Sequence, residues 1–242
     1  MGTQAAIEIG PFGAILVAEA PISFALSGAV RPVTVDGSPI PDQIRSTLQP
    51  GAHLHIGPPT LGARSYLAIG GAAEKGAVTR GSSIAGFAHP SGSIALSTPP
   101  RSVLNSGPLA TVAGPQAELF SEDLTGLTWQ VAMEADRTGI RLQGAALPTL
   151  RDVRTMPSEP QTFGAIQVPP SGQPIIIGPD GPTLGGYPKI AVVISAHLNR
   201  LAQLLPGHSI TFETVSLDAA HALRHEALAQ FQRDTTWRYT QR

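Results

Sequence analysis

The stretch from Gly164 to Gly207 interrupts short apolar runs with closely spaced glycines and prolines, and the whole chain has 26 glycines and 23 prolines among 242 residues. Glycine takes a positive φ and lets the backbone come close to a ligand, whereas proline fixes φ and removes a donor. This composition favours many short strands joined by stiff turns over long helices. The chain is therefore predicted to be mainly β.

Local patterns place several of these strands. Apolar residues alternate with other residues in Ile22–Leu26 and in Leu127–Met133, as in strands that bury one face. The continuous apolar runs Ile175–Ile177 and Ile190–Ile194 indicate interior strands. Asp36-Gly37 follows Val33–Val35 and predicts a hairpin turn.

Two helices are predicted near the C-terminus. The first covers Ala196–Leu205, with Ser195 as its N-cap and Pro206-Gly207 as its stop. The second runs from Leu217 to about Gln232 and places its apolar residues on one stripe.

Composition also bounds the domains and the partners. The segment Gly76–Gly114 is rich in Gly, Ser and Pro, so we expect a boundary near Arg101 between a domain of residues 1–100 and one of residues 101–242. A net charge of -1 gives no electrostatic case for nucleic acid or for an anionic membrane. Charged residues are only 14%, which predicts that part of the surface is covered by a partner.

The sequence offers no sign of export or of thiol chemistry. The apolar run Phe12–Ala18 is too short for a membrane span or a signal peptide, so a cytoplasmic location is expected. The chain has no cysteine, which excludes disulfides and thiolate metal sites. His221 and His225 lie four residues apart on the second predicted helix, but no third ligand has a matching spacing, so no metal site is predicted.

Several segments together resemble one protein family, from about Ile7 to about Phe212. They are Arg64-x-Tyr66-Leu67 with Gly70-Gly71, Gly81–Ser83, the stretch Asp136–Gly144, Ile166–Pro169 with Gly172–Pro174, Asp180, Thr183, Gly185–Ile190, Ser195-Ala196 and Pro206-Gly207. The chain resembles the biotin-dependent carboxyltransferase-like family that includes allophanate hydrolase subunit 2 and the C subunit of 5-oxoprolinase, also described as an antagonist of a sporulation-kinase inhibitor.

The resemblance implies a fold and a function. The family fold is a pair of cyclophilin-like β-barrel domains, and the first barrel is expected to be incomplete here because members carry several dozen more residues before the segment that matches Ile7. The implied function is that of the C subunit in an ATP-dependent 5-oxoprolinase-like complex that activates and opens a cyclic amide, 5-oxoproline. The implied partners are the A-type and B-type subunits of such a complex, of which the B-type resembles this chain, with ATP bound through the complex.

Two other functions stay open. One is a biotin-dependent carboxyltransferase half that acts on urea or a related amide, with biotin on a separate carrier. The other is a regulatory subunit that binds a B-type partner without turnover. The chain has no GxxxxGK[ST] motif, no G-x-S-x-G elbow and no Cys-His pair, so its chemistry is expected to rest on positioning and electrostatics.

Three residues are predicted to be catalytic. Lys189 follows Gly185 and Gly186, whose backbone N–H groups are expected to be exposed, and it is a candidate cation for a phosphate or carboxylate. The alternative is an exposed lysine at a strand edge that contributes little to stability. Asp180 is either a base or the cap of the turn that it starts, and the guanidinium of Arg137 suits a carboxylate or phosphate unless it forms a structural ion pair.

Further residues are predicted to bind substrate, beside the backbone of Gly185 and Gly186. Gln167 lies between Ile166 and Val168, so alternation would turn it to the opposite face. The ring of Tyr187 is a candidate to stack on a flat ligand. The hydroxyl of Ser82 is a candidate to donate a hydrogen bond to an anion, although serine-rich loops are common.

Overall fold

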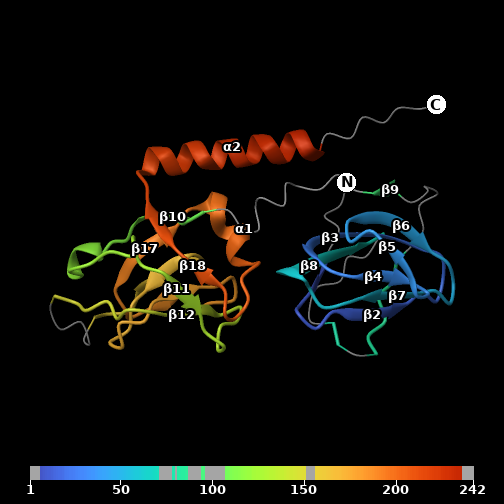
Figure 1. Cartoon of the computed structure of the whole chain (residues 1–242), viewed down its shortest axis with the longest axis horizontal. Coiled ribbons are helices and arrows are strands. Elements are labelled where there is room, and N and C mark those ends of the chain that lie inside the picture. The colour runs from blue at the N-terminus through green and yellow to red at the C-terminus, as the bar shows by residue number, and fades with distance from the viewer. Residues whose placement is uncertain are drawn as a thin grey trace. The chain divides into compact units, whose positions relative to one another are not determined.

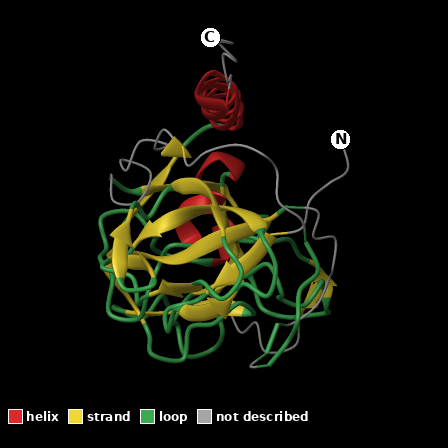
Figure 2. Cartoon of the chain, turned by 90° about the vertical axis from the view of Figure 1, so that its right-hand side faces the viewer, coloured by secondary structure: helices red, strands yellow, loops and turns green. Residues whose placement is uncertain are grey.

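The structure is a computed structural model that describes residues 6–70, 78–79, 81–86, 94–95, 107–150 and 156–235 (Figure 1). It divides into two compact units, residues 1–104 and residues 105–242. Strands and loops dominate both units and helices are few, which confirms the predicted mainly β class (Figure 2).

Unit 1 contains two antiparallel sheets. The first has the order β1 (Ala6–Ile9), β8 (Leu61–Ile69), β3 (Ile22–Val30), β6 (Ile44–Leu48) and β9 (Ile94–Ala95). The second has the order β2 (Ala14–Val17), β7 (His53–Ile56), β4 (Val33–Val35) and β5 (Ser38–Ile40). Apolar side chains from both sheets form one core, which includes Leu26, Leu54, Ile56 and Leu67.

The turn between β4 and β5 is the hairpin that Asp36-Gly37 predicts. Asp36 has a φ of 49° and Gly37 a φ of 78°, the two positive values that a type I′ turn requires. The carboxylate of Asp36 also accepts a hydrogen bond from the backbone N–H of His53, at 2.8 Å. The turn therefore fixes the register of β4 against both of its neighbours.

A buried arginine joins the segments of unit 1. Arg31 follows β3, is only 4% exposed, and donates to four carbonyl oxygens. These belong to Gly57 at 3.1 Å, Ala63 at 3.1 Å, Gly10 at 3.2 Å and Ile9 at 3.5 Å. Burial lowers the pKa of Arg31 from its ordinary value. The guanidinium thus links β1, β8 and the loop after β7 through their backbone.

Unit 2 is built on an eight-stranded sheet. Its order is β18 (Ser209–Ile210), β11 (Trp129–Val131), β12 (Gly139–Gln143), β15 (Ile175–Ile177), β14 (Ala165–Gln167), β17 (Lys189–Val193), β10 (Leu109–Ala113) and β19 (Phe212–Thr214). The two edge strands, β18 and β19, are separated in the chain by Thr211 alone, so the sheet curls into a nearly closed barrel. A short ribbon of β13 (Glu159–Pro160) and β16 (Leu184–Gly185) stands beside it.

The barrel of unit 2 is filled by apolar side chains. Trp129, Leu142, Ile166 and Ile176 are at most 1% exposed and lie in one core cluster. The predicted interior strands are present, because β15 covers Ile175–Ile177 and β17 covers most of the second apolar run.

The helical segments differ in part from the prediction. Ser195–His197 form the 3₁₀ helix η3, and α1 covers only Leu198–Leu201, while a further 3₁₀ helix, η2, covers Ala117–Leu119. The predicted capping by Ser195 is wrong, since Ser195 lies inside η3 and Ile194 precedes that helix without a side-chain cap. None of the helices that the structure describes is long and apolar enough to cross a membrane.

Helix α2 (Leu217–Thr235) confirms the second helical prediction. Ala220 and Leu223 of the predicted stripe pack with Ile194 against unit 2. Leu217 of the same stripe is 61% exposed, so the stripe is buried only in part.

His197 holds the start of β10 in place. Its Nδ1 accepts a hydrogen bond from the backbone N–H of Ala110, at 2.9 Å. Burial and, second, the positive charge of Arg200 lower the pKa of His197. The neutral ring is therefore the form that the fold uses, because a protonated Nδ1 can no longer accept this bond.

This arrangement predicts how stability changes with pH. Because the pKa of His197 is lower in the folded than in the unfolded chain, its contribution is complete above the unfolded value of about 6.5 and is lost as the pH falls through the folded value. His197→Asn keeps an acceptor but does not titrate. Between pH 7.5 and pH 5, we expect the wild type to lose stability relative to this variant in chemical denaturation. Parallel pH profiles would contradict this role of the ring.

Candidate functional site

The ammonium group of Lys189 lies in a polar cluster, which we call the Lys189 cluster (Gln116, Glu159, Gln167 and Lys189). Gln167 and Lys189 are buried, and Gln116 and Glu159 are half-buried. Lys189 Nζ donates to Glu159 Oε2 at 2.7 Å, and Gln116 Nε2 donates to the same oxygen at 3.0 Å. Gln116 Oε1 accepts from the backbone N–H of Lys189 at 3.0 Å. Gln116 therefore hydrogen-bonds both the backbone of Lys189 and the carboxylate with which Lys189 forms its ion pair.

The expectation of an exposed Lys189 is wrong, because the residue is only 5% exposed. It is the first residue of β17, and its ammonium is paired with a carboxylate from β13 instead of reaching solvent. The pKa of Glu159 is lowered by the hydrogen bond from Lys189 and, second, by that from Gln116. The pair therefore keeps Glu159 ionised in the folded chain.

Gln167 is also placed differently from the prediction. The register of β14 against β17 shifts between Ile166 and Gln167, so simple alternation does not hold at this point. Gln167 is opposite Lys189 and is only 5% exposed, and its Nε2 donates to the carbonyl of Tyr187 at 3.3 Å. It therefore does not line an open face but holds the segment that leads into β17.

The two glycines of this segment have different roles. Gly185 lies in β16 opposite Glu159, and a Cβ at this position would collide with Gln167 Nε2 and Gln161 Oε1. A side chain at this position would therefore displace the ends of these two glutamine side chains. A Cβ at Gly186 would meet only ordinary contacts.

Arg137 and Asp180 form a pair with each other. Arg137 Nε lies 2.5 Å from Asp180 Oδ2, and Nη2 lies 3.0 Å from Oδ1, so the guanidinium binds both carboxylate oxygens. The backbone N–H of Asp180 also donates to the carbonyl of Arg137, at 3.1 Å. The pair links the turn before β12 to the turn after β15, which is the structural alternative that the sequence left open.

Ser82 belongs to unit 1, whereas the other predicted site residues belong to unit 2. Its hydroxyl accepts a hydrogen bond from the backbone N–H of Thr79 at 3.0 Å, and its own N–H donates to the carbonyl of Thr79. These bonds make Ser82 the cap of a local turn.

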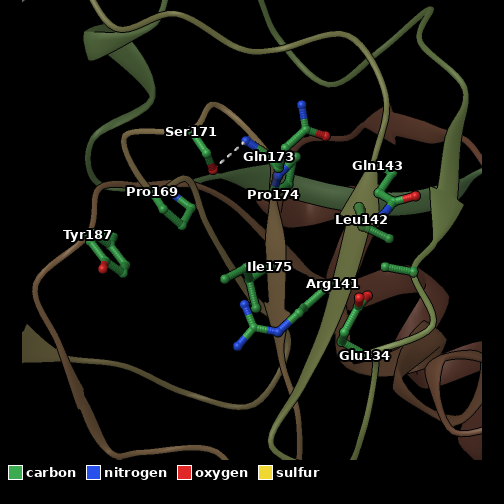
Figure 3. A pocket seen from close by; sticks show the side chains of 11 residues that line it. Glu134, Arg141, Leu142, Gln143, Pro169, Ser171, Gln173, Pro174, Ile175 and Tyr187 are labelled. Atoms are coloured by element: carbon green, nitrogen blue, oxygen red, sulfur yellow. Dashed lines mark hydrogen bonds between the residues drawn. The ribbon is translucent and has the colours of Figure 1, made fainter.

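A pocket of about 400 Å³ opens on unit 2 (Figure 3). Its walls come from β12, from the loop before β15 and from Tyr187, which is 45% exposed. The residues that line it are Ala132, Glu134, Arg141, Leu142, Gln143, Pro169, Ser171, Gln173, Pro174, Ile175 and Tyr187. Tyr187 is thus the predicted binding residue that reaches this pocket, and the Lys189 cluster holds the backbone on either side of it.

Arg141 is the cation of the pocket, and it is not among the site residues predicted from the sequence. It lies on β12 between the buried Ile140 and Leu142, so its side chain leaves the core on the outer face. Figure 3 shows its guanidinium reaching past Ile175 toward the side of Tyr187. The alternation of Gly139–Gln143 is the sequence signal that would have revealed this orientation.

A metal site would need several acidic or histidine side chains close together, because the chain has no cysteine. Within the ranges that the structure describes, no group of three or more His, Asp or Glu side chains is arranged to hold a metal ion. His221 and His225 are exposed on α2.

A family model describes most of the chain. It is the model of the carboxyltransferase domain, subdomains A and B, and it matches residues 2–94 and 84–214. The match spans both structural units.

Curated relatives match different shares of the chain. The 5-oxoprolinase C subunit of Haemophilus influenzae is 50% identical over 98 residues, which are 40% of this chain and 31% of that protein. The urea amidolyase of Lachancea kluyveri is 26% identical over 271 residues, which cover 90% of this chain and 14% of that protein. The matches therefore span less than a third of either relative.

Solved structures share the fold. The crystal structure of the urea amidolyase of K. lactis superposes with a TM-score of 0.80 at 25% sequence identity. The superposition covers 95% of this chain and 17% of that one.

Proposed function

The chain belongs to the family of the carboxyltransferase domain, subdomains A and B, and from this we propose that it acts as the C-type subunit of an ATP-dependent complex that opens a cyclic amide. The observation that carries this proposal is the 50% identity to a 5-oxoprolinase C subunit over 98 residues. The proposed partners are the A-type and B-type subunits of the complex, and the proposed substrate is 5-oxoproline.

Within such a complex, the pocket of unit 2 would bind the amide. Tyr187 presents an exposed ring, and Arg141 and Glu134 present charges of opposite sign. Gln167 and Lys189 act behind the pocket, because Gln167 holds the carbonyl of Tyr187 and the backbone of Lys189 is bound to Gln116 two residues further on. Arg137 and Asp180 hold the two turns together.

The residues of the pocket do not suit a nucleoside triphosphate. A triphosphate needs several cations or N–H donors, whereas the pocket has one guanidinium and one carboxylate. We therefore place ATP with the partner subunits. ATP would supply the phosphoryl group that activates the amide oxygen. One water would then attack the carbonyl carbon and the C–N bond would break, which leaves an amine and an acyl phosphate, and a second water would hydrolyse the acyl phosphate to a carboxylate and phosphate.

One observation favours a second function. The match to urea amidolyase covers 90% of the chain, whereas the match to the 5-oxoprolinase protein covers 40%. The second candidate is therefore one half of a carboxyltransferase that acts on urea, with biotin on a separate carrier.

Reconstitution distinguishes the two functions. The chain is purified with the A- and B-type subunits of the same genome, and ADP and glutamate are measured after addition of ATP and 5-oxoproline. We expect both products only when all components, including this chain, are present. ADP release that requires urea, bicarbonate and a biotinylated carrier would overturn the proposal in favour of the second function, and product formation without this chain would overturn both.

A further inference from the structure

The charges and walls of the unit 2 pocket define a chemical class of ligand. We infer that Arg141 is a specificity residue that binds the carboxylate of a small planar amide, with Tyr187 against the flat face and Glu134 near the amide N–H. This inference rests on the proposed function and deepens it, because it separates carboxylate-bearing amides from neutral ones such as urea.

The guanidinium of Arg141 is available for this role. Within the described part of the chain, it makes no hydrogen bond or ion pair, unlike Arg31, Arg137 and Arg200. Its stem lies beside Ile175, its partner across the β12–β15 ladder, so the head group projects from a strand rather than from a loop. A planar fork of N–H donors on a rigid stem suits a carboxylate, which it can bind through both oxygens.

The second charge of the pocket complements another group of such a ligand. Glu134 lines the same pocket, and Figure 3 shows its carboxylate on the side of Arg141 that faces away from Tyr187. An ionised carboxylate only accepts hydrogen bonds, and an amide N–H donates one. A lactam with a carboxylate carries both complementary groups, whereas urea has N–H groups but no anion for Arg141.

The pocket is held in shape before any ligand binds. Gln173 accepts from the backbone N–H of Gly144 at 2.9 Å and donates to its carbonyl at 3.1 Å, which joins the loop before β15 to the end of β12. Gly172 has a φ of 74°, and a Cβ there would press on Ala146. A volume of about 400 Å³ lies in the range of small-molecule sites. Such preorganisation lowers the entropic cost of binding.

The test compares two lactams that differ only in the carboxylate, 5-oxoproline and 2-pyrrolidone. In the reconstituted complex, Arg141→Gln should raise KM for 5-oxoproline about 10-fold or more, the scale of a lost hydrogen-bonded charge pair. KM for 2-pyrrolidone should not change. Arg141→Lys should recover part of the affinity, because the charge remains but the fork is lost.

A matched control and a direct binding measurement complete the test. Arg224→Gln removes one positive charge from the exposed face of α2 and should leave both KM values as in the wild type. Ligand-observed NMR with the chain alone should show binding of 5-oxoproline that is weakened by Arg141→Gln but not by Arg224→Gln. Thermal melts of each variant check that the fold is intact.

The outcomes separate this inference from the proposed function. An active complex in which Arg141→Gln leaves KM for 5-oxoproline unchanged, or raises KM equally for both lactams, would overturn the inference alone. A wild-type complex without lactam opening would overturn the proposed function, and the NMR measurement on the chain would then decide the inference. Equal binding of the two lactams there, or no binding of either, would overturn it, and selective binding of 5-oxoproline would support it.

Discussion

Replacement of Arg31 by methionine is expected to lower the free energy of unfolding of unit 1 by about 3 kcal/mol or more. The side chain is almost fully buried, and its guanidinium hydrogen-bonds four backbone carbonyls. Methionine fills a similar volume but cannot donate, so it leaves these carbonyls without their partner. A buried acceptor that loses its donor costs about 1–3 kcal/mol.

Because the four carbonyls belong to different elements, removal of the guanidinium is expected to weaken several elements of unit 1 together. Ile9 ends β1, Ala63 lies in β8, and Gly57 directly follows β7, so a single side chain joins elements of both sheets of unit 1. When the guanidinium is removed, the backbone ladder still joins β1 to β8, but β7 belongs to the other sheet and its link to these strands through Arg31 is lost. Arg31→Lys should recover part of the loss, because an ammonium has fewer donors and a different shape.

The measurement needs a signal from unit 1. Both tryptophans of the chain, Trp129 and Trp237, belong to unit 2, so fluorescence reports that unit while calorimetry reports both. We expect the calorimetric transition of unit 1 to fall by about 10 °C or more. Arg64→Met is the control, because the ion pair of Arg64 with Glu8 is partly exposed and its loss should cost about 1 kcal/mol or less. Equal shifts in the two variants would contradict the role of Arg31.

Patterns that depend on neighbouring residues could be predicted from the sequence. Asp36-Gly37 fixes its turn through the φ values of two adjacent residues, and Ile175–Ile177 forms an interior strand because it is apolar on both faces. The helix predicted for Ala196–Leu205 is shorter than its apolar spacing suggests. At its start, Ser195–His197 form a 3₁₀ helix, and the ring of His197 accepts a hydrogen bond from the backbone of Ala110 in a distant strand, a tertiary contact that local propensity does not reveal.

Roles that depend on distant partners could not be predicted. Glu159 lies 30 residues before Lys189, and Gln116 lies 73 residues before it. No local sequence pattern predicts that these three side chains are in contact. Gln167 does not follow the alternation of side chains between the two faces of a strand, because the register of β14 against β17 shifts between Ile166 and Gln167. Arg141 is the opposite case, since alternation with Ile140 and Leu142 already points it away from the core.

Removal of the Lys189–Glu159 pair is expected to have unequal effects on stability. In Lys189→Met, the stem still packs, and Glu159, whose side chain is 36% exposed, turns to water. Replacing a buried charge by an apolar group of similar size is often neutral, so we expect a change within about 1 kcal/mol. Glu159→Ala leaves the ammonium of Lys189 buried without its carboxylate and should lower the melting temperature more.

The same pair gives this difference a pH dependence. The pKa of Glu159 is lower in the folded chain than its ordinary value, because of the hydrogen bonds from Lys189 and then from Gln116. Its contribution is therefore present above the unfolded pKa of about 4.3 and is lost as the pH falls through the folded pKa. Thermal melts at pH 7 should separate Glu159→Ala from the wild type, and melts near pH 3 should bring the two together.

Turnover should respond differently from stability. The ammonium of Lys189 binds Glu159, whose carboxylate also accepts from Gln116, and Gln116 and Gln167 in turn hold the backbone at Lys189 and at Tyr187. Loss of the ammonium is therefore expected to displace the segment that carries Tyr187, and a displacement of about 1 Å at a site can cost about 10²-fold in rate. We therefore expect Lys189→Met to lower kcat for lactam opening by the reconstituted complex about 10²-fold with a nearly unchanged melt, and Lys189→Arg to recover part of it. Since the pocket itself remains, KM should change less than kcat. Wild-type kcat in Lys189→Met would remove Lys189 from the mechanism, and a loss of kcat together with a collapsed melt would restrict the pair to a structural role.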